Sequence, residues 1–258
     1  MVDSLEVIVV VVVTELVPAS IAWYAAYWAF SVWGALAGRI YRKHALLLGV
    51  TAFVFAMVGF LTYSTNQAID DSLLVFYAAA FIFLFAFIDS TIPLARRSDP
   101  MLRSILGWDR LRVGLWGCVI LLAGLNMFPA FGPALANSPF AASSFIGFLL
   151  ENVAWPVVAG ILFGLSGVAL VVGARRSRDP MLRENLKWLG LVLLVVVLIF
   201  VADTSLSFLV PSETEFQFYY SYYALPAGLL LILATVFMYK AARSLVPLSR
   251  VPGHGETI

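Results

Sequence analysis

The chain has few charges, one cysteine and two histidines, and each shortage narrows what the protein can be. Charged residues make up 12% of its 258 residues and hydrophobic residues 62%, a balance far from that of soluble domains. The lone Cys118 excludes an intrachain disulfide. His44 and His254 are both expected in or near loops, so neither bis-histidine haem ligation nor a metal site built on several histidines is available. No nucleotide-binding loop, nucleophile triad or redox pair is present, and the sequence therefore predicts no catalytic residue, no metal site and no identifiable cofactor.

Lysine and arginine are absent from long stretches of the chain. All 16 of them fall in four clusters, at residues 39–43, 96–112, 175–187 and 240–250. The other expected loops and the N-terminal tail carry only acids. Because loops rich in Lys and Arg stay on the cytoplasmic side, this pattern predicts an integral membrane protein with its N-terminus outside and its C-terminus inside. The inner face is expected to contact anionic lipid head groups, and nucleic acid is not expected as a partner.

Long apolar runs alternate with these clusters, and about 20 residues suffice to cross a bilayer as a helix. Seven runs are long enough: 8–37, 45–64, 72–95, 112–131, 145–173, 187–210 and 217–241. An odd number of spans places the termini on opposite sides, as the charges require. We therefore predict an all-α fold, a polytopic seven-transmembrane-helix bundle of the cytoplasmic membrane. It forms a single domain over residues 1–241, and a short cytoplasmic tail follows at 242–258.

Part of the sequence between the apolar runs is repeated. Ala95-Arg-Arg-Ser-Asp-Pro-Met-Leu-Arg103 returns as Ala174-Arg-Arg-Ser-Arg-Asp-Pro-Met-Leu-Arg183, and a tryptophan follows each copy after five residues. A weaker third copy covers residues 242–250. Each copy lies where an odd-numbered helix would leave the membrane on the inside. The bundle is therefore predicted to consist of two-helix hairpin repeats that share one orientation.

The repeated motif has a mechanical interpretation and a functional one. In the mechanical one, Arg-Arg ends a helix, Ser and Asp cap the next helix, and Pro occupies its first turn. The mechanical interpretation also lets the arginines reach lipid phosphates or helix carbonyls and places the tryptophans at head-group level. In the functional one, the same region is a cytoplasmic docking surface for a partner protein. The residues concerned are Arg96, Arg97, Arg103, Arg175, Arg176, Arg183, Trp108 and Trp188. Both interpretations remain open at this stage.

Glycines recur at a spacing that permits close helix packing. Gly34 and Gly38, and likewise Gly160 and Gly164, are four residues apart, and Gly167 extends the second pair. Such spacing is typical of helices that touch inside a bundle or between protomers. It favours close contacts along the first and fifth predicted helices, and a homo-oligomer is one way to provide them.

Chemistry in such a bundle is expected at acids within the apolar runs. Three acids lie about six or seven residues inside the outer ends of their runs, near 10 Å deep at ~1.5 Å per residue. No basic residue is expected at that depth, so each carboxyl group must be protonated, hydrated, hydrogen-bonded or bound to a cation. One hypothesis is a shared proton or cation site with polar neighbours; the alternative is separate acids near the outer interface. The hypothetical site comprises Glu15, Glu151, Asp203, Asn126, Asn152 and Thr204.

Three functions are consistent with these features. The first is a membrane protein that handles protons or cations through the outer acids. The second is a non-catalytic subunit or anchor of a larger membrane complex, for example a respiratory one, in which other subunits cover the apolar surfaces. The third is a membrane sensor or a lipid- or carotenoid-modifying enzyme. Retinal binding is not expected, because Lys240 is at the inner end of the seventh run and not in its middle.

Overall fold

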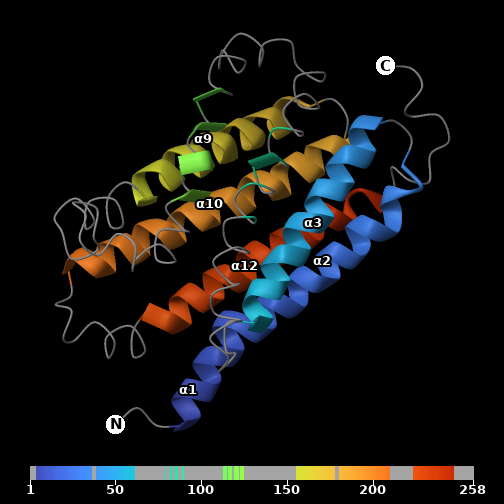
Figure 1. Cartoon of the computed structure of the whole chain (residues 1–258). Helices are drawn as coiled ribbons and strands as arrows, with labels where there is room; N and C mark the ends of the chain where they lie inside the picture. Colours follow the sequence, from blue (N-terminus) through green and yellow to red (C-terminus); the bar gives the residue numbers. More distant parts are fainter. Residues whose placement is uncertain are drawn as a thin grey trace.

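The computed structural model describes residues 4–36, 39–61, 155–177, 180–209 and 223–246, with isolated positions in 79–89 and 113–124. Throughout these residues the regular structure is helical and contains no strand (Figure 1). One continuous helix starts the chain and consists of α1 (Ser4–Val11), the π-helical segment η1 (Val12–Leu16) and α2 (Val17–Trp33). The other helices are α3 (Arg39–Leu61), α9 (Trp155–Arg176), α10 (Pro180–Leu209) and α12 (Ala224–Arg243).

Among the described residues, three helices are long and apolar enough to cross a membrane. They are Ile8–Trp33, Tyr41–Leu61 and Ala224–Arg243, of 26, 21 and 20 residues. They overlap the first, second and seventh predicted spans, and α9 and α10 overlap the fifth and sixth. The third and fourth predicted spans fall on the isolated positions, and each position described there is helical.

Several helix boundaries differ from the predicted ones. α3 begins at Arg39, six residues before the predicted 45, and α10 begins at Pro180, seven residues before 187. The cause is that the prediction followed apolar runs, whereas long basic side chains continue a helix beyond the hydrocarbon by extending toward water. In the second copy of the repeated motif, α9 ends at Arg176 and α10 begins at Pro180, where the mechanical interpretation places Arg-Arg and Pro. The predicted cap at Asp179 lies outside the described residues.

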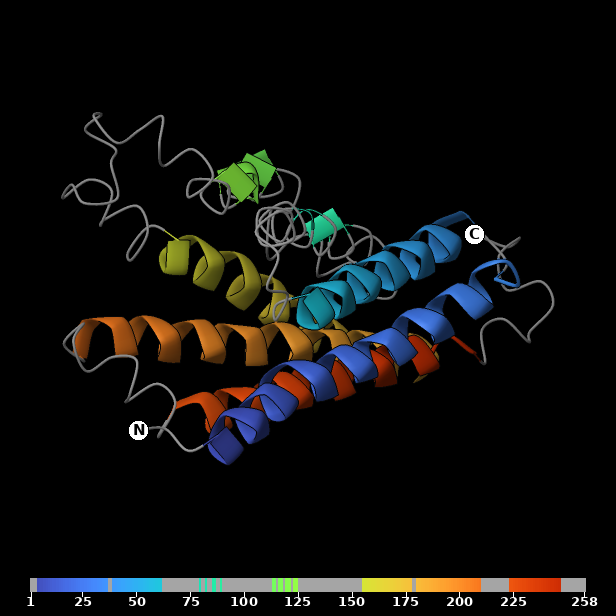
Figure 2. The same cartoon turned by 60° about the horizontal axis from the view of Figure 1, so that its bottom comes forward.

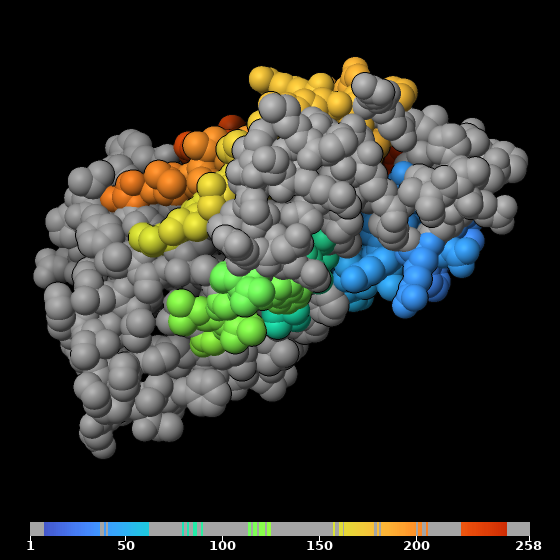
Figure 3. All heavy atoms as spheres, turned by 90° about the horizontal axis from the view of Figure 1, so that it is seen from above, coloured from blue at the N-terminus to red at the C-terminus, as the bar shows by residue number. Residues whose placement is uncertain are grey.

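The helices pack as a connected series in which α12 has the central place. α2 contacts α3, α9 contacts α10, and α12 contacts both α10 and α2. In Figure 2, α10, α12 and α2 form one layer, and α9 and α3 lie on the same side of it. Figure 3 shows the described parts of 79–89 and 113–124 side by side, and there the rings of Phe85 and Trp116 meet edge to face with their centroids 4.8 Å apart. The largest fully buried side chains, which include Phe163, Leu48 and Leu186, belong to this bundle.

Small residues set the closest helix contacts. A Cβ built on Gly190 of α10 would lie 2.9 Å from the carbonyl oxygen of Gly167 on α9 and 2.7 Å from Val171 Cγ2. By contrast, a Cβ on Gly34 or Gly160 would meet no described atom within 4 Å. Among the described residues, neither Gly34 nor Gly160 makes a close contact, whereas Gly167, which extends the second pair, lies against α10. Gly38 lies outside the described residues, and contact between protomers stays a prediction. Spacing along one helix does not determine which face turns toward a neighbour, and here that face carries Gly167.

Candidate functional site

Glu15 lies in the π-helical segment of the first helix. This segment, Val12–Leu16, is a place where the helix accommodates an extra residue per turn, and π-turns in helices are frequent at functional sites. Thr14, directly before Glu15, is buried, and its hydroxyl donates a hydrogen bond to the Val10 carbonyl at 2.9 Å. Glu15 itself is half-buried. Within the described part of the chain, no side chain forms a hydrogen bond or ion pair with its carboxyl group.

Two other helices approach this segment at glycines. A Cβ on Gly228 of α12 would lie 2.8 Å from Val13 Cγ1 and 3.1 Å from Thr14 Cγ2. A Cβ on Gly59 of α3 would lie 2.8 Å from the Cβ of Ala19 and 3.2 Å from the backbone oxygen of Glu15. The backbone around Glu15 is therefore enclosed on two sides by helices that can approach because they lack side chains there. This arrangement fixes the position of the turn that carries the carboxyl group.

The other members of the predicted outer site are less fully described. Asp203 and Thr204 belong to α10, whose backbone alone is described at these two positions. Tyr223 donates a hydrogen bond from its hydroxyl to the Ile199 carbonyl at 3.3 Å, which ties the start of α12 to α10 one turn before Asp203. Glu151, Asn126 and Asn152 lie outside the described residues. Convergence of the outer acids on one site stays a prediction.

A buried polar network occupies the opposite end of the bundle, and sequence reasoning missed it. His44 and Asn185 are 0% and 1% exposed, and Nε2 of His44 lies 3.0 Å from Oδ1 of Asn185. The Asn185 amide donates to the Ala241 carbonyl at 2.9 Å and to Ser244 Oγ at 3.0 Å. Ser244 Oγ in turn donates to the Ala241 carbonyl at 2.7 Å. Because the amide nitrogen of Asn185 already donates twice, its oxygen accepts from His44, which assigns the proton to Nε2.

This network joins α3, α10 and α12 through hydrogen bonds of 2.7–3.0 Å. His44 was expected in or near a loop because it follows Arg42 and Lys43. The available signal was the helical periodicity, since His44 is four residues before Leu48 and seven before Thr51, and all three are buried. A buried polar network in which every group has a hydrogen-bond partner makes helix packing specific. With a single proton on the His44 ring, at Nε2, this network carries no net charge. We therefore assign the network a structural role, that of holding the three helices together.

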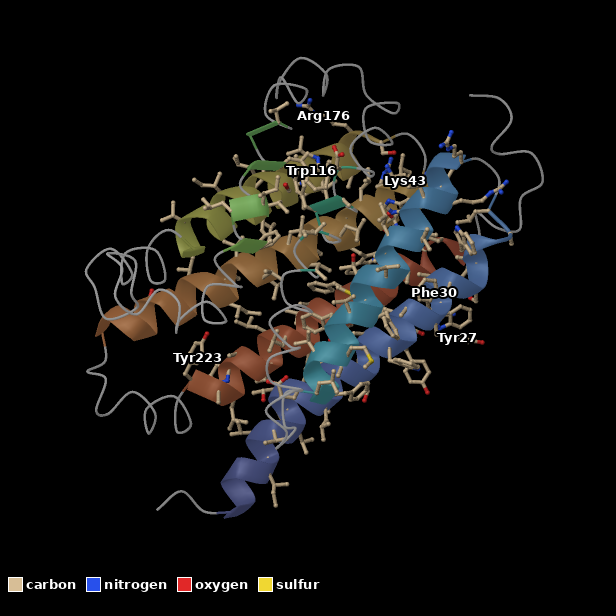
Figure 4. All side chains as sticks on the ribbon, viewed as in Figure 1. Tyr27, Phe30, Lys43, Trp116, Arg176 and Tyr223 are labelled. Carbon is tan, nitrogen blue, oxygen red and sulfur yellow. The ribbon has the colours of Figure 1, made fainter. Side chains whose placement is uncertain are left out.

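Basic residues gather at this same end of the bundle. The described Lys and Arg side chains lie within the first eight residues of α3 and α10 and in the last turns of α9 and α12. Figure 4 shows Lys43 and Arg176 at this end and Tyr223 at the other. The residues are Arg39, Arg42, Lys43, Arg175, Arg176, Arg183, Lys187, Lys240 and Arg243. Antiparallel packing of neighbouring helices brings the separate clusters of the sequence together.

The residues predicted for head-group or partner docking have different surroundings. Arg175 and Arg176 are exposed at the end of α9. Arg183 turns back onto the preceding helix and donates to the Ser177 carbonyl from Nε at 3.2 Å and Nη2 at 2.8 Å, so it caps the end of α9. Trp188 is half-buried between α10 and α12. The residues of the first copy, Arg96, Arg97, Arg103 and Trp108, lie outside the described ones.

Metal ligation and similarity to known proteins give no further assignment. Over the described residues, no group of three or more His, Cys, Asp or Glu side chains could hold a metal ion. Comparisons with protein-family models, with curated proteins and with solved structures found no match to this chain.

Proposed function

We propose that this chain is a multi-pass protein of the cytoplasmic membrane that handles protons or cations through carboxyl groups in the outer half of the bilayer. Glu15 is the central residue of this proposal, with Asp203 and Glu151 as its partners in a layer of acids. In the full arrangement, seven helices built from hairpin repeats cross the membrane, with the N-terminus outside and the C-terminus in the cytoplasm. The three described helices that are long and apolar enough to cross a membrane are compatible with this arrangement.

The distribution of charge supports the proposed orientation. In the part of the chain that the structure describes, Lys and Arg occur only at the end of the bundle that carries the His44 network. Glu15 lies toward the other end, on the side where the chain begins (Figure 1). Because Lys and Arg remain on the cytoplasmic side, the end with Glu15 is then the outer one.

The single observation that carries the functional proposal is the setting of Glu15. A half-buried carboxyl group lies at a π-turn inside an apolar helix, and the described residues provide it with no hydrogen bond or ion pair. An ionised carboxylate in hydrocarbon costs several kcal/mol, so an acid there marks an ion or proton pathway in many membrane proteins. Carboxylate oxygens are suitable ligands for protons and hard cations. The enclosing glycines, Gly59 and Gly228, hold the turn in one place, which a binding group requires.

The test is flux through the full chain reconstituted in liposomes, with proton, sodium and potassium gradients imposed in turn. We expect Glu15→Gln to lower the flux at least about tenfold, because the amide neither releases a proton nor binds a cation as a carboxylate does. Glu15→Asp should retain part of the flux. Glu184→Gln is the matched control, since Glu184 is a half-exposed acid at the basic end. Wild-type flux in a folded Glu15→Gln protein would refute the proposal.

A second function, that of a subunit in a larger membrane complex, is favoured by one face of α2. Tyr24 and Tyr27 lie within the span Ile8–Trp33 and are 62% and 61% exposed, and Figure 4 shows Tyr27 directed away from the bundle. Hydrocarbon gives a phenol hydroxyl no hydrogen-bond partner, whereas a neighbouring protein helix does. This function predicts other chains, or further copies of this one, in the particle extracted with mild detergent. Native mass spectrometry of a monomeric, solitary chain would exclude it.

A further inference from the structure

Trp188, on α10, lies at the contact between α10 and α12, where an aromatic ring and two ammonium groups surround it. Its ring lies 5.4 Å from that of Phe237 on α12. The Lys187 ammonium is 4.6 Å from the indole centroid, and the Lys240 ammonium, from the other helix, is 4.4 Å from it. Cation–π contacts at these distances restrict where the two ammonium groups lie. Two positive charges from different helices are thus positioned beside one ring.

Within the described structure, neither of these two charges is paired with a buried acid. Lys187 forms an ion pair with Glu184 at 3.7 Å, but both side chains are about half exposed, and such surface pairs contribute little. Lys240 has no acid within ion-pair distance in the described ranges. The two ammonium groups repel each other, and an anion placed near both would remove that repulsion. The chemistry at this position therefore selects a negatively charged ligand.

Apolar side chains continue from the two lysines toward the middle of the bundle. On α10, the exposed Leu198 and Val201 share the helix face of Lys187, at spacings of eleven and fourteen residues. On α12, Leu229 and Leu233 share the face of Lys240, and Leu229 is 62% exposed. Both faces point outward from the two packed helices, with Trp188 and Phe237 in the seam between them. An apolar surface about the length of a half-membrane thus ends at a cationic site.

We infer that the outward face of α10 and α12 binds an anionic phospholipid, with the head-group phosphate at Lys187 and Lys240 and the acyl chains along the leucines below. Basic positions between transmembrane helices bind anionic head groups on the cytoplasmic side, and a tryptophan at this depth is typical of the membrane interface. The inference depends on the proposed placement in the membrane and is independent of the chemistry at Glu15. A soluble phosphate would not use the apolar faces, so the occupant is the lipid.

The test compares lipid affinities by native mass spectrometry of the full-length protein in neutral detergent. The probes are phosphatidylglycerol and phosphatidylcholine with the same dioleoyl chains. We expect Lys187→Gln with Lys240→Gln to lower the affinity for phosphatidylglycerol roughly 30-fold, the size expected for two interfacial lysines, and to leave that for phosphatidylcholine unchanged. Lys187→Arg with Lys240→Arg should bind nearly as the wild type does.

The matched control removes two exposed charges at the same end of the bundle, by Arg39→Gln with Lys43→Gln, and should change phosphatidylglycerol affinity less than about threefold. An equal loss in this control would mean a general charge effect and would overturn the inference. Equal wild-type affinities for the two lipids would overturn it too, as would displacement of the lipid by millimolar inorganic phosphate. Glu15→Gln should keep the lipid affinity, so failure of the flux proposal and failure of this one are distinguishable.

Discussion

His44 Nε2 and Asn185 Oδ1 lie 3.0 Å apart, and this hydrogen bond joins the second turns of α3 and α10 across 141 residues of sequence. Neither side chain is exposed beyond 1%. Since this bond forms only after the two helices have come together, it belongs to the final packing of the bundle. Because Asn185 also donates to α12, the same side chain connects three helices at the basic end of the protein.

Asn185→Leu is expected to destabilise the protein by about 1–3 kcal/mol, because it leaves a buried His44 nitrogen without its acceptor. Thermal unfolding in detergent, followed by circular dichroism, measures the loss. The double variant, His44→Leu with Asn185→Leu, should recover part of that stability, since replacing both partners removes the unsatisfied group. If the double variant is as unstable as the sum of the two single variants, the two side chains are not coupled.

Gly190→Ala should destabilise the contact between α9 and α10. Its new methyl group would lie 2.7 Å from Val171 Cγ2 and 2.9 Å from the Gly167 carbonyl oxygen, so the helices have to separate, at a cost of about 1–3 kcal/mol. Gly160→Ala is the matched control, because no described atom lies within 4 Å of that position. Alanine favours helix over glycine by up to ~1 kcal/mol, so the control should unfold at the same or a higher temperature. Equal unfolding temperatures for the two variants would contradict the close crossing.

Cysteine labelling tests the predicted orientation. In a Cys118→Ala background, Glu213→Cys is expected to react with a membrane-impermeant maleimide in intact cells, because it belongs to a loop without Lys or Arg. Arg178→Cys, in the second copy of the repeated motif, should react only after the membrane is permeabilised. Both positions are chosen from the sequence, since they lie outside the described residues. The reverse pattern would invert the assignment of the inner and outer sides.

Much of the helical framework could be predicted from hydrophobicity and from the repeated motif. The boundary at Arg176 and Pro180 follows from local chemistry, since Pro fits the first turn of a helix and basic residues fit the last. The π-turn at Val12–Leu16 could not be predicted, because an apolar run carries no pattern that distinguishes one hydrogen-bond register from another. The rotation of each helix about its axis could not be predicted either, so the spacing pointed to Gly160 as well as to Gly167 and did not identify Gly190 as the partner of Gly167.

The candidate site also has one part that the sequence predicts and another that it does not. Glu15 is visible in the sequence, because a carboxyl group inside an apolar run is rare and costly. The enclosure of its turn by Gly59 and Gly228 depends on tertiary packing, which single-sequence patterns do not encode. His44 was missed for a related reason. Neighbouring charges suggested a loop, while its burial comes from helices that lie far away in the sequence.

The central place of α12 has a consequence for how the protein is made. The hairpins α2–α3 and α9–α10 form between neighbours in the described chain, but α12 contacts both α10 and α2 and follows both of them in the sequence. Until it leaves the ribosome, the first helix lacks Gly228 against its π-turn, and Asn185 lacks its partners at Ala241 and Ser244. A chain terminated before Ala224 lacks both sets of contacts, and we expect a protease to digest it faster than the full chain.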